Sequence, residues 1–103
     1  MTTLDRYNQL ADELGITEEM NVSPVIRLGF AREQATQMKS IVNRLLFDLT
    51  MAYAAMEKAK DENTVAAYKD NISKHERELR QTRDGLVLTN ELVTLLEEIV
   101  AED

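Results

Sequence analysis

Two long series of mostly apolar residues, spaced alternately three and four residues apart, constrain this sequence more than any other feature. Steps of three and four that continue over more than four heptads are typical of the buried seam between coiled α-helices. The first series is Leu28, Ala31, Ala35, Met38, Val42, Leu45, Leu49, Ala52, Met56 and Ala59. The second is Val65, Tyr68, Ile72, His75, Leu79, Thr82, Leu86, Thr89, Val93, Leu96 and Val100.

A polar segment, K-D-E-N-T at residues 60–64, separates the two series and predicts a turn. If the chain folds back there, residues whose numbers sum to 124, such as Leu45 and Leu79, face each other along both series. One register therefore satisfies both patterns, and agreement of this kind is what specifies a fold. We predict an all-α chain built on a long, coiled-coil-like antiparallel hairpin, with helices over 24–60 and 64–101.

The dipeptide Asp84-Gly85 is the one weak point in the second long helix, because Gly lowers helix propensity. The apolar series keeps its phase across this dipeptide. We interpret Gly85 as a local weak point or a close-packing position in one long helix. The alternative is a break in the helix, which D-G can also support.

A short helix is predicted over 3–14, with Thr2 or Thr3 as its N-cap and Gly15 ending it in the left-handed conformation. Its apolar face matches a second stripe on the last helix, made of Leu88, Leu92, Leu95 and Ile99. Two-helix packing cannot cover that stripe. We therefore expect the short helix to pack on the open end of the hairpin as a local three-helix bundle, within a single domain of residues 1–103.

The segment L-A-D-E-L-G-I-T, residues 10–17, has the spacing of the first half of a DNA-binding helix-turn-helix. A recognition helix would have to follow it and reach out with basic and amide side chains. The residues that follow instead include the acidic Glu18 and Glu19 and contain no Lys or Arg, and Pro24 then comes where a recognition helix would continue. This composition argues against DNA recognition by this element.

Composition excludes several functional classes. The 103 residues contain no Cys and one His, and the net charge is −7. A disulfide framework and a thiolate metal site are thus excluded, and the charge argues against a strong electrostatic hold on nucleic acid. The sequence shows no signal peptide and no apolar run of membrane-spanning length, so we expect a cytoplasmic protein with no membrane partner.

No constellation for catalysis is recognisable in the sequence. The single His75 falls on the seam opposite Leu49, and its neighbours Glu76 and Glu78 point to other faces. Neither a glycine-rich phosphate loop nor a nucleophile paired with a base is present. We expect a non-enzymatic protein with no cofactor and no metal site.

The first long helix carries apolar side chains outside its seam, in the segment I-V-N-R-L-L-F-D-L-T-M-A-Y-A-A-M at residues 41–56. A helix that is apolar nearly all round is usually buried on more than one side. The proposed interaction face is Leu46, Phe47, Thr50, Tyr53 and Ala54. Our leading hypothesis is a helical assembly or interaction protein that acts as a homo-oligomer, a dimer or larger, through this face.

Acidic residues gather at the chain ends, and they suggest an alternative. Residues 1–24 carry a net charge of −4 and residues 84–103 a net charge of −6. An inhibitor or nucleic-acid mimic that blocks a basic site on another protein would use such an end. The proposed acidic end is Glu18, Glu19, Glu91, Glu97, Glu98, Glu102 and Asp103.

A third hypothesis is an oligomeric subunit of a nucleic-acid packaging or regulatory machine. Its basic residues would be Arg27, Arg32, Lys39 and Arg44 along the first long helix. The same residues have an ordinary interpretation as solvated flanks of the seam. Arg27, Arg32 and Arg44 would also neutralise part of the acidic end.

Overall fold

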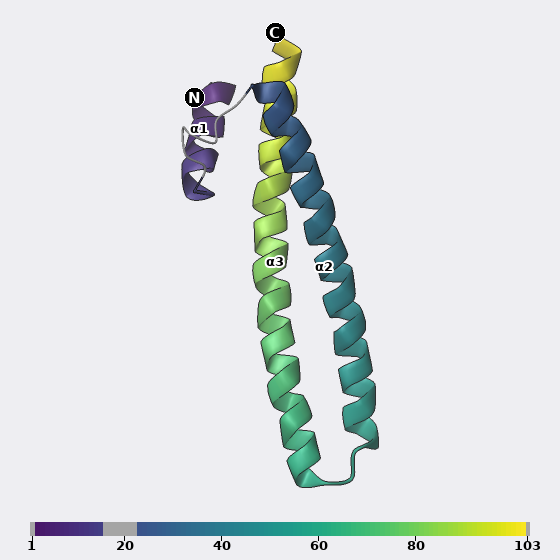
Figure 1. Ribbon diagram of the computed structural model, residues 1–103. Helices are drawn as coiled ribbons and strands as arrows, with labels where there is room; N and C mark the ends of the chain where they lie inside the picture. Colours follow the sequence, from purple (N-terminus) through teal and green to yellow (C-terminus); the bar gives the residue numbers. More distant parts are fainter. Residues whose placement is uncertain (1, 16–22, 103) are drawn as a thin grey trace. The chain divides into compact units, whose positions relative to one another are not determined.

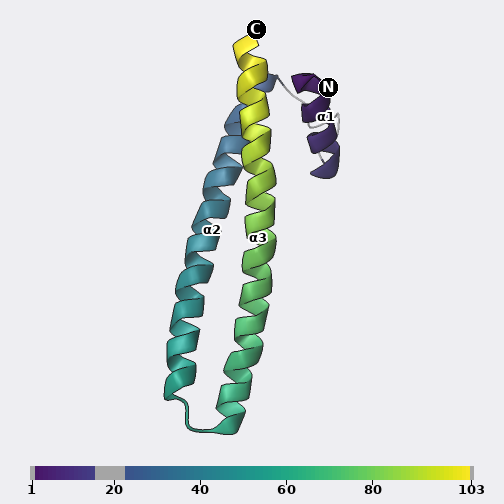
Figure 2. The ribbon, with the colours of Figure 1, turned by 180° about the vertical axis from the view of Figure 1, so that it is seen from behind.

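A computed structural model describes residues 2–15 and 23–102, and every regular element in those residues is an α-helix. The helices are α1 (Thr3–Glu13), α2 (Pro24–Lys58) and α3 (Glu62–Glu102). In Figures 1 and 2, α2 and α3 run alongside each other and are joined by a short turn. The two long helices pack against each other, and α1 contacts α3. The predicted all-α helical hairpin is confirmed.

The ends of α1 are held by local hydrogen bonds that satisfy backbone groups left over by the helix. The hydroxyl of Thr2 accepts a bond from the Asp5 N–H at 3.1 Å, and the Asp5 carboxylate accepts one from the Thr2 N–H at 3.3 Å. This reciprocal arrangement is a capping box. After the C-cap residue Leu14, Gly15 adopts a φ of +74°. The left-handed residue that ends the helix is therefore the glycine expected there.

The turn between the long helices lies two residues earlier in the chain than predicted. α2 ends at Lys58 and α3 begins at Glu62, whereas the sequence pattern places these ends at 60 and 64. The early start of α3 follows from Asp61. Its carbonyl accepts a bond from the Val65 N–H at 3.0 Å, and its carboxylate accepts one from the Thr64 hydroxyl at 3.1 Å.

Helix α3 continues through Asp84-Gly85 without a break. The carbonyl of Gly85 accepts a hydrogen bond from the buried Thr89 hydroxyl at 2.9 Å, four residues later. This bond satisfies a polar group that would be costly to bury alone. The interpretation of Gly85 as part of one long helix is confirmed, and the alternative of a break is wrong.

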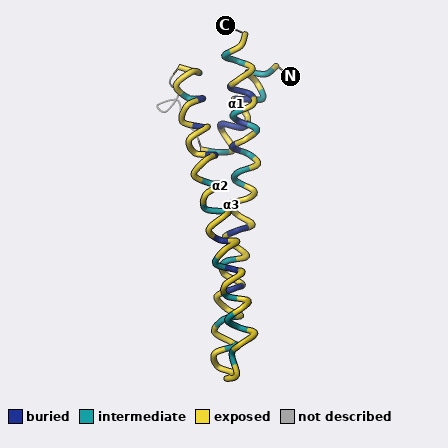
Figure 3. The backbone as a smooth tube through the Cα atoms, turned by 90° about the vertical axis from the view of Figure 1, so that its right-hand side faces the viewer, coloured by how far each residue is buried: buried dark blue, intermediate teal, exposed yellow. Residues whose placement is uncertain are grey.

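The chain divides into two compact units. The terminal unit comprises Met1–Gln37 and Gly85–Asp103, and the turn unit comprises Met38–Asp84. In both units, every seam residue is buried or half-buried, and most other positions on the long helices are exposed (Figure 3). A single domain over residues 1–103 stays a prediction.

The core of the turn unit lies on the seam. Four apolar side chains form its buried cluster, with partly buried neighbours packed against them. Each such side chain contributes about 1.5–3 kcal/mol when it leaves water. The cluster consists of Leu45, Leu49, Ile72 and Leu79, and the neighbours are Ile41, Val42, Ala52 and Met56.

The core of the terminal unit joins all three helices. From α1 it takes Tyr7 and Leu10, and Leu10 is 0% exposed. The other buried members are Leu28, Ala31, Leu92, Leu95 and Leu96, with Leu14, Leu88, Val93, Ile99 and Val100 packed against them. The second apolar stripe of α3 is thus in contact with α1, as predicted for a local three-helix bundle.

Two polar contacts across the hairpin show the same register in each unit. In the terminal unit, Arg32 donates to Glu97 at 3.3 Å, and in the turn unit, Tyr53 donates to Glu76. The residue numbers sum to 129 in both pairs, and each residue directly follows a seam residue. Positions that flank the seam on one side of an antiparallel pair are related in this way. The contacts therefore agree with the register predicted from the two apolar series.

The register predicts a cross-link in the turn unit. With Leu45→Cys and Leu79→Cys in one chain, oxidation should form a disulfide within the chain, since facing backbones come within about 7 Å. Mass spectrometry of the digested, unreduced protein would detect it. The matched control is Leu45→Cys with Ile72→Cys, one heptad out of register. Preferential cross-linking of the control pair would overturn the register.

The burial of Leu10 predicts that α1 contributes directly to stability. Leu10→Ala should lower the free energy of unfolding by about 2–5 kcal/mol, because it leaves a cavity in the three-helix core. Urea unfolding followed by circular dichroism would measure the loss. Asn8→Ala is the matched control, since Asn8 is exposed on the same helix. Equal transitions for the two variants would show that α1 adds nothing to the core.

Candidate functional site

The interaction face predicted on α2 lies at exposed positions of the turn unit. All five of its residues, Leu46, Phe47, Thr50, Tyr53 and Ala54, are exposed. Phe47 is 64% exposed, and Met51, which lies one turn further along the helix, is 55% exposed. Exposed large apolar side chains that gather on one element mark interaction sites more often than scattered ones do.

The polar member of this face is satisfied within its own helix. The hydroxyl of Thr50 donates to the Leu46 carbonyl at 2.9 Å. Such a bond uses the only hydrogen that the side chain can donate. The Thr50 side chain therefore has no hydrogen left to donate to a partner.

Tyr53 differs from its neighbours because it also takes part in the hairpin. Its hydroxyl donates to the Glu76 carboxylate on α3. This hydrogen bond, followed by desolvation and by repulsion from the Glu76 charge, raises the pKa of Tyr53 above its ordinary value. The protonated phenol is therefore favoured in the folded chain. The contribution of this contact to the stability of the fold is present below the ordinary tyrosine pKa. It is lost as the pH rises through the raised pKa of Tyr53.

A shallow groove of about 400 Å³ lies on the turn unit. It contains the only His of the chain and one carboxylate, Asp48. The Nδ1 atom of His75 lies 2.8 Å from the Asn71 carbonyl of its own helix. Within residues 2–15 and 23–102, no three side chains are grouped so that they could hold a metal ion. The groove is lined by Asp48, Met51, Ala52, Ala55, Tyr68, Asn71 and His75.

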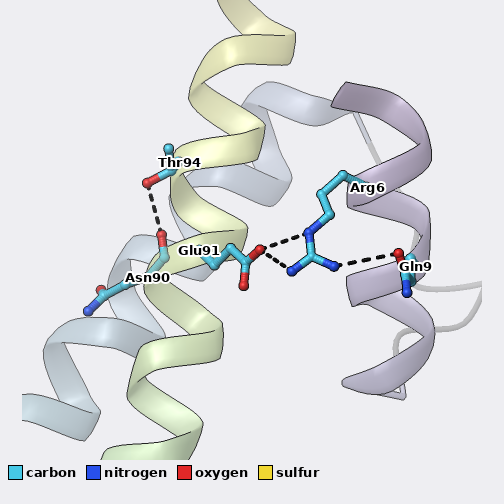
Figure 4. Close-up of polar contacts among 5 residues, drawn as sticks. All are labelled: Arg6, Gln9, Asn90, Glu91 and Thr94. Carbon is cyan, nitrogen blue, oxygen red and sulfur yellow. Dashed lines mark hydrogen bonds and ion pairs between the residues drawn. The ribbon is translucent and has the colours of Figure 1, made fainter. Parts of the chain in front are cut away.

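Several residues of the predicted acidic end already have partners in the terminal unit. Glu91 accepts two hydrogen bonds from the Arg6 guanidinium, one of them from Nε at 2.8 Å, and Arg6 also donates to Gln9 (Figure 4). Glu97 pairs with Arg32 at 3.3 Å. Glu98 accepts a bond from the Thr3 hydroxyl at 3.5 Å. The ion pairs with Arg6 and Arg32 reduce the negative charge available to a basic partner.

Of the other residues predicted for the acidic end, only Glu102 lies in the part of the chain that the structure describes. Glu102 is exposed at the last residue of α3. Glu18, Glu19 and Asp103 lie outside the described residues. The sequence reasoning missed the pair of Arg6 and Glu91. The only feature of the sequence that points to this ion pair is that each charged residue directly precedes an apolar residue of its helix, Tyr7 for Arg6 and Leu92 for Glu91.

The basic residues considered for nucleic acid binding are also partly engaged. Arg32 is paired with Glu97. The Nε and Nη2 atoms of Arg27 are buried, and they have no hydrogen-bond partner among the residues that the structure describes. Lys39 and Arg44 are exposed. Arg27 and Arg32 therefore do not offer freely exposed positive charges, which a nucleic-acid-binding surface would need.

A second exposed apolar group on α2 was missed by the sequence reasoning. Val25, Ile26 and Phe30 lie in the terminal unit, and Phe30 is 57% exposed. The segment V-I-R-L-G-F holds four large apolar residues, of which the seam uses only Leu28. The three unused residues precede Leu46, Phe47 and Met51 by 21 positions, which is three heptads. That repeat is the signal that would have found them.

Comparison with protein-family models, with curated proteins and with solved structures finds no match to the chain.

In the part of the chain that the structure describes, no helix combines the length and the apolar character needed to cross a lipid bilayer.

The contact between Tyr53 and Glu76 predicts a measurable titration. Glu76→Ala removes the acceptor and the negative charge, so the pKa of Tyr53 should fall toward its ordinary value. An NMR titration of the ring signals, assigned with Tyr53→Phe, would follow it. Glu78→Ala is the control, because this exposed carboxylate lies on the same helix. Identical titrations in both variants would exclude the contact in solution.

Proposed function

We propose that this chain is a non-enzymatic helical assembly protein that acts as a homo-oligomer through the exposed apolar side of α2. The observation that carries the proposal is the position of the phenylalanines. The chain contains only two, Phe30 and Phe47, and they are 57% and 64% exposed on α2. A monomer would leave both rings in water, where each loses the stabilisation that burial gives.

The seam explains why these rings cannot be buried by the hairpin itself. Each long helix turns one face toward the other, and that face is filled by the two apolar series. Phe30 and Phe47 lie on α2 away from this seam. A second copy of the chain supplies the same apolar side chains, so a two-fold interface would be self-complementary. Aromatic residues that such an interface buries account for much of its binding energy.

A single charge on this face should reduce the size of the particle. The wild type should have a mass of at least twice the 11.8 kDa of one chain. Phe47→Glu should shift the mass toward that of one chain, because a carboxylate would have to be desolvated at the interface. Sedimentation or light scattering would measure the mass, and circular dichroism would check the helices. Phe47 is preferable to Tyr53 for this test, since a carboxylate at position 53 would oppose Glu76 within the hairpin.

Gln81→Glu is the matched control. Gln81 is exposed on α3 in the same unit, so the variant adds one negative charge without touching α2. It should keep the wild-type mass. A wild-type protein that sediments as a single 11.8 kDa chain at tens of micromolar would contradict the proposal, and so would equal effects of the two substitutions.

A further inference from the structure

Helix α2 carries a second series with the spacing of a seam, outside the series that faces α3. We call it the outer stripe, and its steps are alternately four and three residues. Because α2 is one continuous helix, residues at these spacings share one side of it. All nine members are exposed: Ile26, Phe30, Glu33, Gln37, Ser40, Arg44, Phe47, Met51 and Ala54.

The order of residues in the outer stripe is complementary to its own reverse. Large apolar side chains lie toward both ends, and polar ones lie between them. We propose that a second copy of this chain binds along the outer stripe with its α2 antiparallel, in the register where facing residue numbers sum to 77. This deepens the proposed function and depends on it. The facing pairs are Ile26 with Met51, Phe30 with Phe47, Glu33 with Arg44, and Gln37 with Ser40, each occurring twice.

Charge complementarity favours this arrangement. Glu33 and Arg44 are the only charged members of the outer stripe, and they have opposite signs. Neither takes part in an ion pair with any residue that the structure describes. In the proposed register, each carboxylate of Glu33 meets the guanidinium of Arg44 from the other copy. Charged groups arranged in this way select both the partner and the register.

Other alignments of the same stripe are much poorer. A slip of one heptad in one direction sets Ile26 against Arg44 and Phe47 against Ser23. The opposite slip sets Phe47 against Gln37 and Met51 against Glu33. A parallel, in-register pair would place Glu33 against Glu33 and Arg44 against Arg44, so like charges would meet at both places. The antiparallel register is thus the one in which both apolar groups and both charges are matched.

Charge reversal tests the register through two variants, each of which should dimerise poorly alone and well when mixed with the other. E33R sets two positive charges against each other at two points of the homodimer, and R44E sets two negative charges against each other at the same points. Each variant alone should raise the dissociation constant of the dimer about tenfold or more. An equimolar mixture should form a heterodimer, because the stripe of the E33R copy is then positive at both charged positions and that of the R44E copy is negative at both. The double variant E33R with R44E should form homodimers as the wild type does.

Native mass spectrometry distinguishes the outcomes, because the two variants differ in mass. The antiparallel register is supported if the homodimers of both single variants are weaker than the wild-type dimer and the heterodimer exceeds both of them. A parallel pair would also form the heterodimer, but its single variants would dimerise as the wild type does. If the wild type is a dimer that Phe47→Glu dissociates, but the mixture gives no preference for the heterodimer, the register is wrong and self-association stands. If the wild type is a single chain, both proposals fail. Circular dichroism of each variant checks that the helices remain, as expected for substitutions at the exposed Glu33 and Arg44.

Discussion

The close packing of the two apolar series is the interaction on which the rest of this structure depends. Isolated helices are marginal in water, and most of their stability comes from the face that they bury. In each unit, the seam residues of α2 and α3 are buried or half-buried, and the positions between them are mostly exposed. The hairpin therefore fixes which side of each long helix remains available for other contacts.

The two long helices differ in how far their apolar side chains outside the seam are covered. The second stripe of α3 is covered from within the chain, because α1 places Tyr7 and Leu10 in one cluster with Leu92 and Leu95. The Arg6–Glu91 pair adds a polar contact between the same two helices. On α2, the large apolar side chains outside the seam are mostly left exposed among the described residues. The large apolar side chains left exposed along α2 are the physical basis for proposing an assembly protein.

The sequence predicts the hairpin, its register and the packing of α1, because each rests on a periodic pattern that is long enough to be unambiguous. It predicts less well what depends on single side chains. Asp61 starts α3 early through bonds to its own neighbours, and Arg6 reaches Glu91 across 85 residues of chain. The face from Leu46 to Ala54 is recognisable as a dense apolar run, whereas Phe30 was missed because only two other unused apolar residues accompany it.

The polar middle of the outer stripe has a physical purpose if α2 pairs with itself. A uniformly apolar stripe would bind more strongly, but it would slip by heptads and would not distinguish parallel from antiparallel partners. Polar residues at a few seam positions lower stability and in return specify register and orientation. Along the outer stripe, Glu33 and Arg44 lie between Phe30 and Phe47, so the charged pairs lie between the two aromatic pairs of the proposed dimer. The aromatic side chains then provide the attraction, and the charges restrict it to one alignment.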